Sequence, residues 1–447
     1  MAEDNRERKK LSRRDLIKGG LLAGAFLALK KCLPGGTIEE PGSIAQGVTP
    51  TPTNQSSLLA PDATLTPEAY LPYVSKPAST PTPSPPGSSR VVHVHDPDAT
   101  SWDFGNDYYG NFVDQDVVNE MVDQGVMELT GTSSVAQAWQ SLIPDYTPGK
   151  AIAVKVNFNN SFSMCEGCLS DCEDYQLKID ALIHPINAVI RGLKAAYPAF
   201  DHSNIWVYDA SPGQDPPGSH RIITGRFTDG CLYSEVRFFD RECREEATFS
   251  STDPTAQVTF SPPQGIPTPS DQKITDILVN ATYLINMPIM KRHMFAGVTL
   301  GFKNHFGSVD DCKLLHQWIA LDGDYYGGTT YNPLVDLYSN PNIKDKTVLT
   351  IGDGLFGNWE SNERKSQPWS TFGNQAPNSL FFATDPVAID SVMCDFVYSE
   401  GYRTDERWRD YLVAAEAAGL GVYEQGDPWQ EPWGSGYSKI DYWRIGL

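Results

Sequence analysis

Short apolar runs alternate with longer segments of helical periodicity from residue 90 onward, and no other feature of the chain limits its possible folds so strongly. A strand inside a parallel sheet is covered on both faces, so it reads as a nearly continuous apolar run. A helix instead repeats its apolar residues every three or four positions. We expect strands at 90–96, 151–158, 204–210, within 276–290, 346–354 and 379–385, and helices at 111–128, 177–195, 386–398 and 404–418. This order predicts a Rossmann-like α/β fold, with a mostly parallel sheet and helices on both faces.

Residues 211–270 interrupt the alternation. They show no helical periodicity and are rich in proline, threonine and charged residues. We therefore expect a small irregular or β insertion there, with a hairpin around 231–239, inside a single domain that spans 90–447. Pro185 lies within the helix expected at 177–195 and should kink it, because proline removes a helical hydrogen bond.

The first 89 residues differ from the rest in charge and composition. Residues 1–36 carry nine Lys or Arg against four Asp or Glu, although the whole chain has a formal net charge of −21. Arg13 and Arg14 precede a short apolar run at 19–29, and this arrangement resembles a twin-arginine (Tat) export signal. Residues 37–89 hold 11 of the 33 prolines and many Ser and Thr, so we expect a disordered linker there.

These patterns predict a protein that is exported by the Tat machinery and works outside the cytoplasm, at the cell surface, in the periplasm or secreted. A signal that stays uncleaved would be its only attachment to a membrane. The acidic remainder of the chain argues against nucleic acid as a partner, because proteins that bind nucleic acids present a basic face.

Polar residues stand at the carboxyl ends of five expected strands, which is where ligands bind in open α/β sheets. Three of these residues, Asp209, Asp353 and Asp385, carry carboxylates suited to a hard cation such as Mg²⁺, Ca²⁺ or Mn²⁺, and added histidine would favour Zn²⁺ or iron. Asp385 has an alternative role as the N-cap of the helix that begins with Pro386.

The densest group of polar side chains lies within 286–309, where lysine, arginine and histidine stand among glycines. Lysine and histidine bind carboxylates or phosphates, and they exchange protons when burial tunes their pKa. We predict that Lys291, His293 and Lys303 act on a small anionic ligand. The side chains expected to bind it are Lys155, Asn157, Asp209, Asn304, His305, Asp353 and Asp385. The alternative is that the cations only neutralise acidic neighbours such as Asp310 and Asp311.

A set of short motifs from about residue 150 onward resembles one bacterial and archaeal family. The motifs are Lys155-Val156-Asn157, MPIMKRH at 287–293, TLGFKNHFG at 299–307, IGDGLFG at 351–357 and ATDPVAID at 383–390. In this order they are similar to the family called domain of unknown function 362. The resemblance implies a Rossmann-like α/β fold, and it implies no particular reaction. It also supports a site made of Lys291, His293, Lys303, Asn304 and Asp385.

The run CEGCLSDC groups Cys165, Cys168 and Cys172. Three cysteines at this spacing can hold a metal ion or an iron–sulfur cluster with a fourth ligand, such as Cys231, Cys243 or a histidine. Disulfides are the alternative, because export leads to an oxidising compartment. Cys231 and Cys243 would suit such a pairing.

Three functions stay open on these grounds. The favoured one is an exported protein that binds or transforms a small anionic ligand at the strand ends, with or without a metal ion. The second is an iron–sulfur or other metal-containing redox protein built on Cys165, Cys168 and Cys172. The third is a non-catalytic binding module mounted on a stalk.

Overall fold

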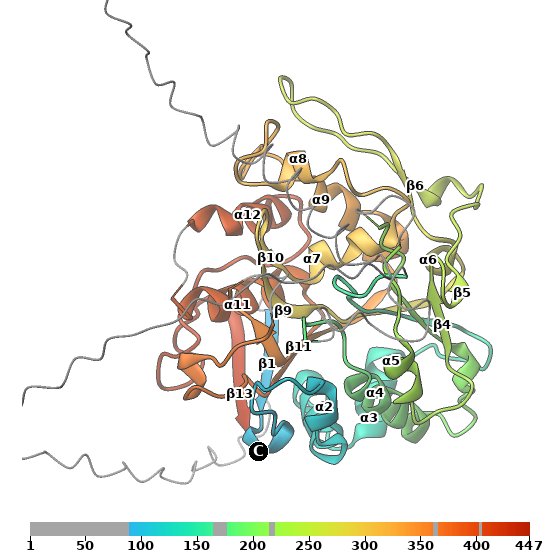
Figure 1. The fold of residues 1–447 in the computed structure, drawn as a ribbon, viewed down its shortest axis with the longest axis vertical. Helices are drawn as coiled ribbons and strands as arrows, with labels where there is room; N and C mark the ends of the chain where they lie inside the picture. The colour runs from blue at the N-terminus through green and yellow to red at the C-terminus, as the bar shows by residue number, and fades with distance from the viewer. Residues whose placement is uncertain (1–88, 164–176, 214–219, 361–364, 402–404) are drawn as a thin grey trace, which may run out of the picture. The chain divides into compact units, whose positions relative to one another are not determined.

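The computed structural model describes residues 89–163, 177–213, 220–360, 365–401 and 405–447. Eleven strands form one mixed sheet in the order β13-β1-β12-β11-β8-β2-β3-β4-β5, and β9 and β10 extend it beside β11 (Figure 1). Neighbouring strands are parallel except in the pairs β1–β12, β11–β12 and β9–β10. The strands are β1 (Ser89–His95), β2 (Ile152–Lys155), β3 (Ile205–Tyr208), β4 (Arg237–Asp240), β5 (Glu245–Glu246), β8 (Tyr283–Asn286), β9 (Ile289–His293), β10 (Gly297–Thr299), β11 (Thr347–Asn358), β12 (Ser379–Ala383) and β13 (Ile440–Gly446). Two further short strands, β6 (Gln257–Val258) and β7 (Gln272–Lys273), pair with each other.

Helices pack on both faces of the sheet, and the alternation of side chains along each strand explains how. Ile152 and Val154 of β2 join one apolar cluster with α2, α3 and α4. Ala153 points to the opposite face and joins a second cluster with α6, α7 and α9 to α12. The helices are α2 (Gln115–Thr130), α3 (Val135–Leu142), α4 (His184–Ala196), α5 (Gly225–Asp229), α6 (Asp276–Asn280), α7 (Gly301–Asn304), α8 (His316–Ile319), α9 (Pro333–Tyr338), α10 (Pro341–Lys344), α11 (Pro386–Ser399) and α12 (Asp410–Ala417). The expected α/β fold with a mostly parallel sheet is confirmed.

A topological switch point lies between β2 and β8. The helix after β2, α4, packs in one apolar cluster, whereas the helix before β8, α6, packs in the cluster on the opposite face. Adjacent parallel strands with connections on opposite faces leave a crevice at their carboxyl ends. The strand registers place Lys155, at the end of β2, beside Tyr208 of β3 and Asn286 of β8. The end of β2 is therefore the centre of the ligand-binding edge that this fold provides.

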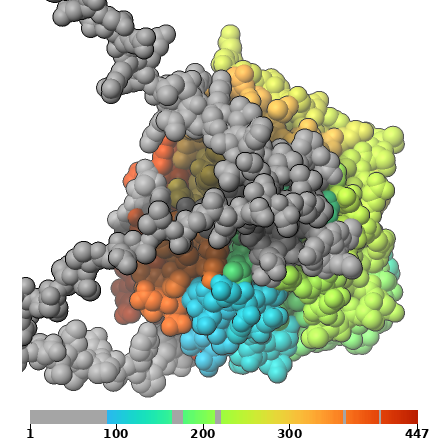
Figure 2. Space-filling model, in the orientation of Figure 1, coloured from blue at the N-terminus to red at the C-terminus, as the bar shows by residue number. Residues whose placement is uncertain are grey.

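Two local expectations need correction. Pro185 does not kink a helix, because α4 begins at His184 and the proline occupies its first turn, where no hydrogen bond is lost. The segment 231–239 does not form a hairpin. Its end belongs to β4, which pairs parallel with β3 and extends the main sheet. Residues 220–270 form one side of the face that Figure 2 shows, in yellow-green.

Among the described helices, none combines the length and the apolar character that crossing a membrane would require.

Candidate functional site

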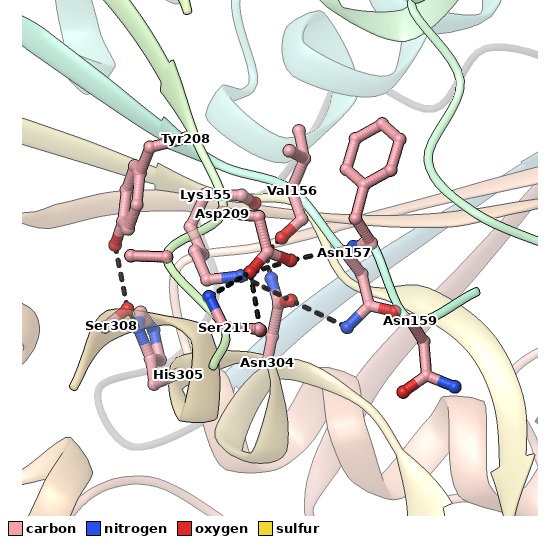
Figure 3. A network of polar contacts seen from close by, with 12 residues as sticks. Lys155, Val156, Asn157, Asn159, Tyr208, Asp209, Ser211, Asn304, His305 and Ser308 are labelled. Atoms are coloured by element: carbon pink, nitrogen blue, oxygen red, sulfur yellow. Dashed lines mark hydrogen bonds and ion pairs between the residues drawn. The ribbon is translucent and has the colours of Figure 1, made fainter. Parts of the chain in front are cut away.

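A buried ion pair marks the carboxyl ends of β2 and β3 (Figure 3). The Lys155 ammonium lies 3.2 Å from Oδ2 of Asp209, and both side chains are buried. Asp209 also accepts the backbone N–H of Phe158 at 2.7 Å and the hydroxyl of Ser211 at 2.6 Å. Burial lowers the pKa of Lys155, and the Asp209 charge opposes that shift. These hydrogen bonds stabilise the Asp209 carboxylate, because a buried charge is costly unless it is paired and hydrogen-bonded.

Two asparagines connect this pair to β8 and β9. Asn304 Oδ1 accepts hydrogen bonds from Lys155 Nζ at 3.3 Å and from Asn157 Nδ2 at 3.2 Å. Asn304 Nδ2 in turn donates to Asn286 Oδ1 at 2.8 Å. On the other side, Asn157 Oδ1 accepts from the buried Lys291 ammonium at 2.7 Å. Five side chains predicted for the site, Lys155, Asp209, Asn304, Asn157 and Lys291, are therefore brought into one network.

The close approach of the 301–308 segment depends on a glycine. A Cβ atom on Gly307 would lie 2.4 Å from Asp209 Oδ1 and 2.6 Å from Lys155 Nζ, so the buried ion pair would have to shift. The Gly307 carbonyl accepts the backbone N–H of Ala210 at 2.9 Å. The glycine lets α7 and the 3₁₀ turn after it (His305–Ser308) lie directly on the ion pair.

Beside this network lies a polar cavity, which we call the Lys303 cavity. Its volume is about 70 Å³. Two of the described residues that line it, Lys303 and Arg221, have strongly basic side chains, and none of them is Asp or Glu. The other lining residues are Asn157, Phe158, Asn159, Ser211, Pro212, His293, Met294, Phe295, Thr299, Asn304, Phe306, Gly307, Cys312 and His316.

Lys303 is the unusual member of this wall. Its side chain is buried, and among the described residues its ammonium has neither a hydrogen-bond acceptor nor an ion-pair partner. It lies over the ring of Phe306, 4.4 Å from the centroid. Burial, together with the charges of Lys291 and Arg221, lowers the pKa of Lys303 to about 7, although Cys312 opposes the shift. An amine in this state is partly neutral near neutral pH.

Two histidines of the cavity wall are held in opposite tautomers by the backbone. His293 Nδ1 accepts the N–H groups of Phe295 and Ala296, each at 3.2 Å, so the proton of the neutral ring lies on Nε2. His316 Nδ1 lies 3.1 Å from the Lys313 carbonyl, so that nitrogen carries the proton and Nε2 is bare. The two rings stack with centroids 5.8 Å apart.

Both histidines are neutral at ordinary pH. Burial lowers the pKa of His293 well below its usual value, and the Lys303 charge adds to the effect. Burial, followed by Lys303, lowers the pKa of His316 to about 3. The cavity therefore offers one imidazole N–H donor and one imidazole acceptor without adding charge.

Several predicted residues lie outside the cavity wall. Lys291 is buried behind Asn157 and positions that side chain. His305 is buried too; its Nδ1 lies 3.1 Å from the Ser308 hydroxyl, and its ring packs against Tyr338. Asp353 lies within β11, where its carboxylate accepts the backbone N–H of Leu355 at 3.0 Å.

Asp385 does not line the Lys303 cavity. β12 runs antiparallel to β11, and its last residue, Ala383, pairs with Thr350 of β11, three strands away from β2. Asp385 is the N-cap of α11 and accepts the backbone N–H groups of Val387 and Ala388, each at 2.9 Å. The N-cap role, which the sequence offered as the alternative for Asp385, is thus the one that its hydrogen bonds show.

The cavity residues that the sequence patterns missed include Arg221, Thr299, Cys312 and His316. The Thr299 hydroxyl is buried, and no described residue forms a hydrogen bond with it. Arg221 and His316 come from segments without a strand or helix signal, and only the folded chain brings them to β9. Thr299 lies inside the TLGFKNHFG motif, which did carry a signal.

The strand-end aspartates do not gather around a common point. No group of three His, Cys, Asp or Glu side chains able to hold a metal ion exists in the part of the chain that the structure describes. Cys165, Cys168 and Cys172 lie outside the described residues. Cys231 carries a free thiol, so its expected disulfide with Cys243 is wrong.

Comparisons with known proteins give one family and a distant structural likeness. The model of the family described as domain of unknown function (DUF362) matches residues 234–395, which include Lys291, His293, Lys303 and Asn304. Lys155, Asn157 and Asp209 lie outside the match. A comparison with curated proteins gives no match.

Two solved structures resemble the chain at low identity. One is the lactate racemase apoprotein from Thermoanaerobacterium thermosaccharolyticum, with 12% identity over 70% of this chain and 58% of that one, and a TM-score of 0.35. The other is a protein from Thermotoga maritima, with 14% identity over 64% of this chain and 58% of that one, and a TM-score of 0.31. The likeness thus spans less than two thirds of either neighbour.

Proposed function

We propose that the Lys303 cavity binds a small anion and that this binding is the function of the site. One observation carries the proposal: two basic side chains line a cavity whose described wall holds no carboxylate, in a chain with a net charge of −21. A buried charge is costly unless it is paired. Because no described residue of the wall is a partner for Lys303, an anion from solution is the group that satisfies it.

The cavity also limits the size of this anion. The cavity volume of about 70 Å³ is well above the roughly 10–15 Å³ that a single water molecule needs. That is room for a small carboxylate of a few heavy atoms. Asn159, Thr299 and the two imidazoles line the cavity and supply neutral hydrogen-bonding groups, which fix the orientation of a ligand without competing for its charge.

The test compares thermal stability with and without small anions. We expect acetate, lactate and pyruvate, at constant ionic strength, to raise the Tm of the purified protein, because a ligand that binds only the folded state stabilises it by mass action. Lys303→Met should abolish this shift. Without added anion, the same variant should be at least as stable as the wild type, since it removes an unpaired buried charge.

Lys313→Met is the matched control, because Lys313 lies ten positions away and is exposed. It should leave both the basal Tm and the anion-induced shift unchanged. An anion-induced shift of full size in Lys303→Met would show that the anion binds elsewhere.

A further inference from the structure

We propose that the amine of Lys303 is a nucleophile, and that it forms an imine with the carbonyl group of a 2-oxo carboxylate bound in the Lys303 cavity. This inference rests on the proposed function and names the class of ligand. The cavity places a buried amine, the guanidinium of Arg221 and two imidazoles around one small volume. These are the groups needed to hold a carboxylate and to attack the carbonyl next to it.

A comparison of the three buried lysines at this edge of the sheet singles out Lys303. Lys155 is paired with Asp209, and Lys291 donates a hydrogen bond to Asn157. Both amines are therefore engaged through their protons. Lys303 has no such acceptor among the described residues, and it faces a cavity. Its lone pair is thus the one available for attack when the amine is neutral.

The surroundings of Lys303 favour the neutral amine. Burial is the main cause, and the neighbouring charges of Lys291 and Arg221 act in the same direction. Desolvation and adjacent cations are the two means by which proteins activate lysine nucleophiles. A carboxylate held by Arg221 would leave the neutral Lys303 amine free to react.

The histidines supply the proton transfers of the reaction. Nζ of Lys303 adds to the carbonyl carbon, whose oxygen accepts a hydrogen bond from Nε2–H of His293. The bare Nε2 of His316 takes one proton from the nitrogen and passes it to this oxygen, which gives a neutral carbinolamine. The second proton of the nitrogen follows the same route to the hydroxyl group, which leaves as water as the C=N bond forms. One water is released for each imine, and no oxidant or reductant is consumed.

The experiment is reductive trapping. The full-length protein is incubated with pyruvate and sodium cyanoborohydride, digested with a protease and mapped by mass spectrometry. We expect one reduced pyruvate unit on Lys303 in most molecules. The control is lactate, which has the same carboxylate but no carbonyl group and should give no adduct. Lys313 should stay unmodified beyond the level found in the denatured protein.

The outcomes separate this inference from the proposed function. Stabilisation by lactate and pyruvate without an adduct on Lys303 would overturn the imine and leave anion binding standing. Absence of both stabilisation and adduct would overturn both. An adduct spread evenly over exposed lysines would also overturn the inference. Lys303→Arg, which keeps the charge but lacks a nucleophilic amine, should retain part of the lactate-induced shift and lose the adduct.

Discussion

Lys155 and Asp209 form a charged pair with almost no exposure to water, so the fold must offset the cost of removing both charges from solvent. Asp209 achieves this with hydrogen bonds from Phe158 and Ser211. Lys155 relies on Asn304 and on the Val156 carbonyl, to which its ammonium donates. The pair therefore stabilises the site only as a complete network.

Asp209→Asn should lower the free energy of unfolding by about 3–5 kcal/mol near neutral pH, because it leaves the Lys155 ammonium buried without its countercharge. The pKa of Lys155 is already lowered by burial, and loss of Asp209 removes the opposing effect and lowers it further. The unfolded state then binds more protons than the folded state, so stability of the variant should rise with pH. Denaturant titrations at about pH 6 and about pH 9 measure this slope.

Ser211→Ala is the control for that variant. It removes one hydrogen bond to Asp209, 2.6 Å long, and leaves both charges in place. We expect a loss of about 1 kcal/mol with no added dependence on pH. Equal pH slopes in the two variants would contradict an ionised Lys155 at this position.

Among the elements, α7 and α11 have the closest bearing on the site. The Asp390 carboxylate, on α11, accepts the backbone N–H groups of Gly301 at 2.7 Å and Phe302 at 3.1 Å, and the Tyr411 hydroxyl at 3.0 Å. It thus fastens the first turn of α7, the helix that carries Lys303 and Asn304. Burial raises the pKa of Asp390 to about 7, so this contact is sensitive to its protonation.

Asp390→Asn should cost about 1–3 kcal/mol of stability, because an amide NH₂ group replaces an oxygen that accepts a hydrogen bond. It should also weaken the anion-induced rise in Tm, since α7 would no longer be held in place.

Asp385→Ala tests the neighbouring cap. We expect a cost of about 1 kcal/mol with unchanged anion binding. Thermal shifts with and without lactate distinguish the two, and an undiminished shift in Asp390→Asn would contradict the role of α7.

On the scale of the whole molecule, the first and the last described strands, β1 and β13, pair with each other at one edge of the sheet. β13 pairs parallel with β1 over seven residues, from Ser89 with Ile440 to His95 with Gly446. His93 Nδ1 lies 2.8 Å from the Tyr442 hydroxyl, which ties the strands through the core. Without β13, β1 would become an open strand edge able to pair with other chains.

A chain that ends at Lys439 should lose at least about 3 kcal/mol of stability, because Ile440 and Tyr442 are buried and each contributes about 1.5–3 kcal/mol. It should also aggregate more readily on heating. Denaturant unfolding followed by light scattering measures both effects. A chain that ends at Gly446 keeps β13 and should behave like the full-length protein; equal stability of the two truncations would contradict the role of β13.

Much of the site was predictable from the ends of strands. Lys155, Asn157 and Asp209 follow apolar runs, and the chain must place such residues at an edge of the sheet. The glycine-rich segment 299–307 also drew attention through its own residues. Arg221 and His316 gave no such signal, because nothing local distinguishes them from ordinary surface residues.

The sequence by itself determined which segments become strands and helices, since burial on two faces requires continuous apolar runs and burial on one face requires helical spacing. Tertiary structure alone decided the position of β12 in the sheet, three strands from β2, and the packing that leaves Lys303 without a partner among the described residues. These features depend on which segments, far apart in the sequence, come into contact in the fold, and a local pattern of side chains does not reveal such contacts.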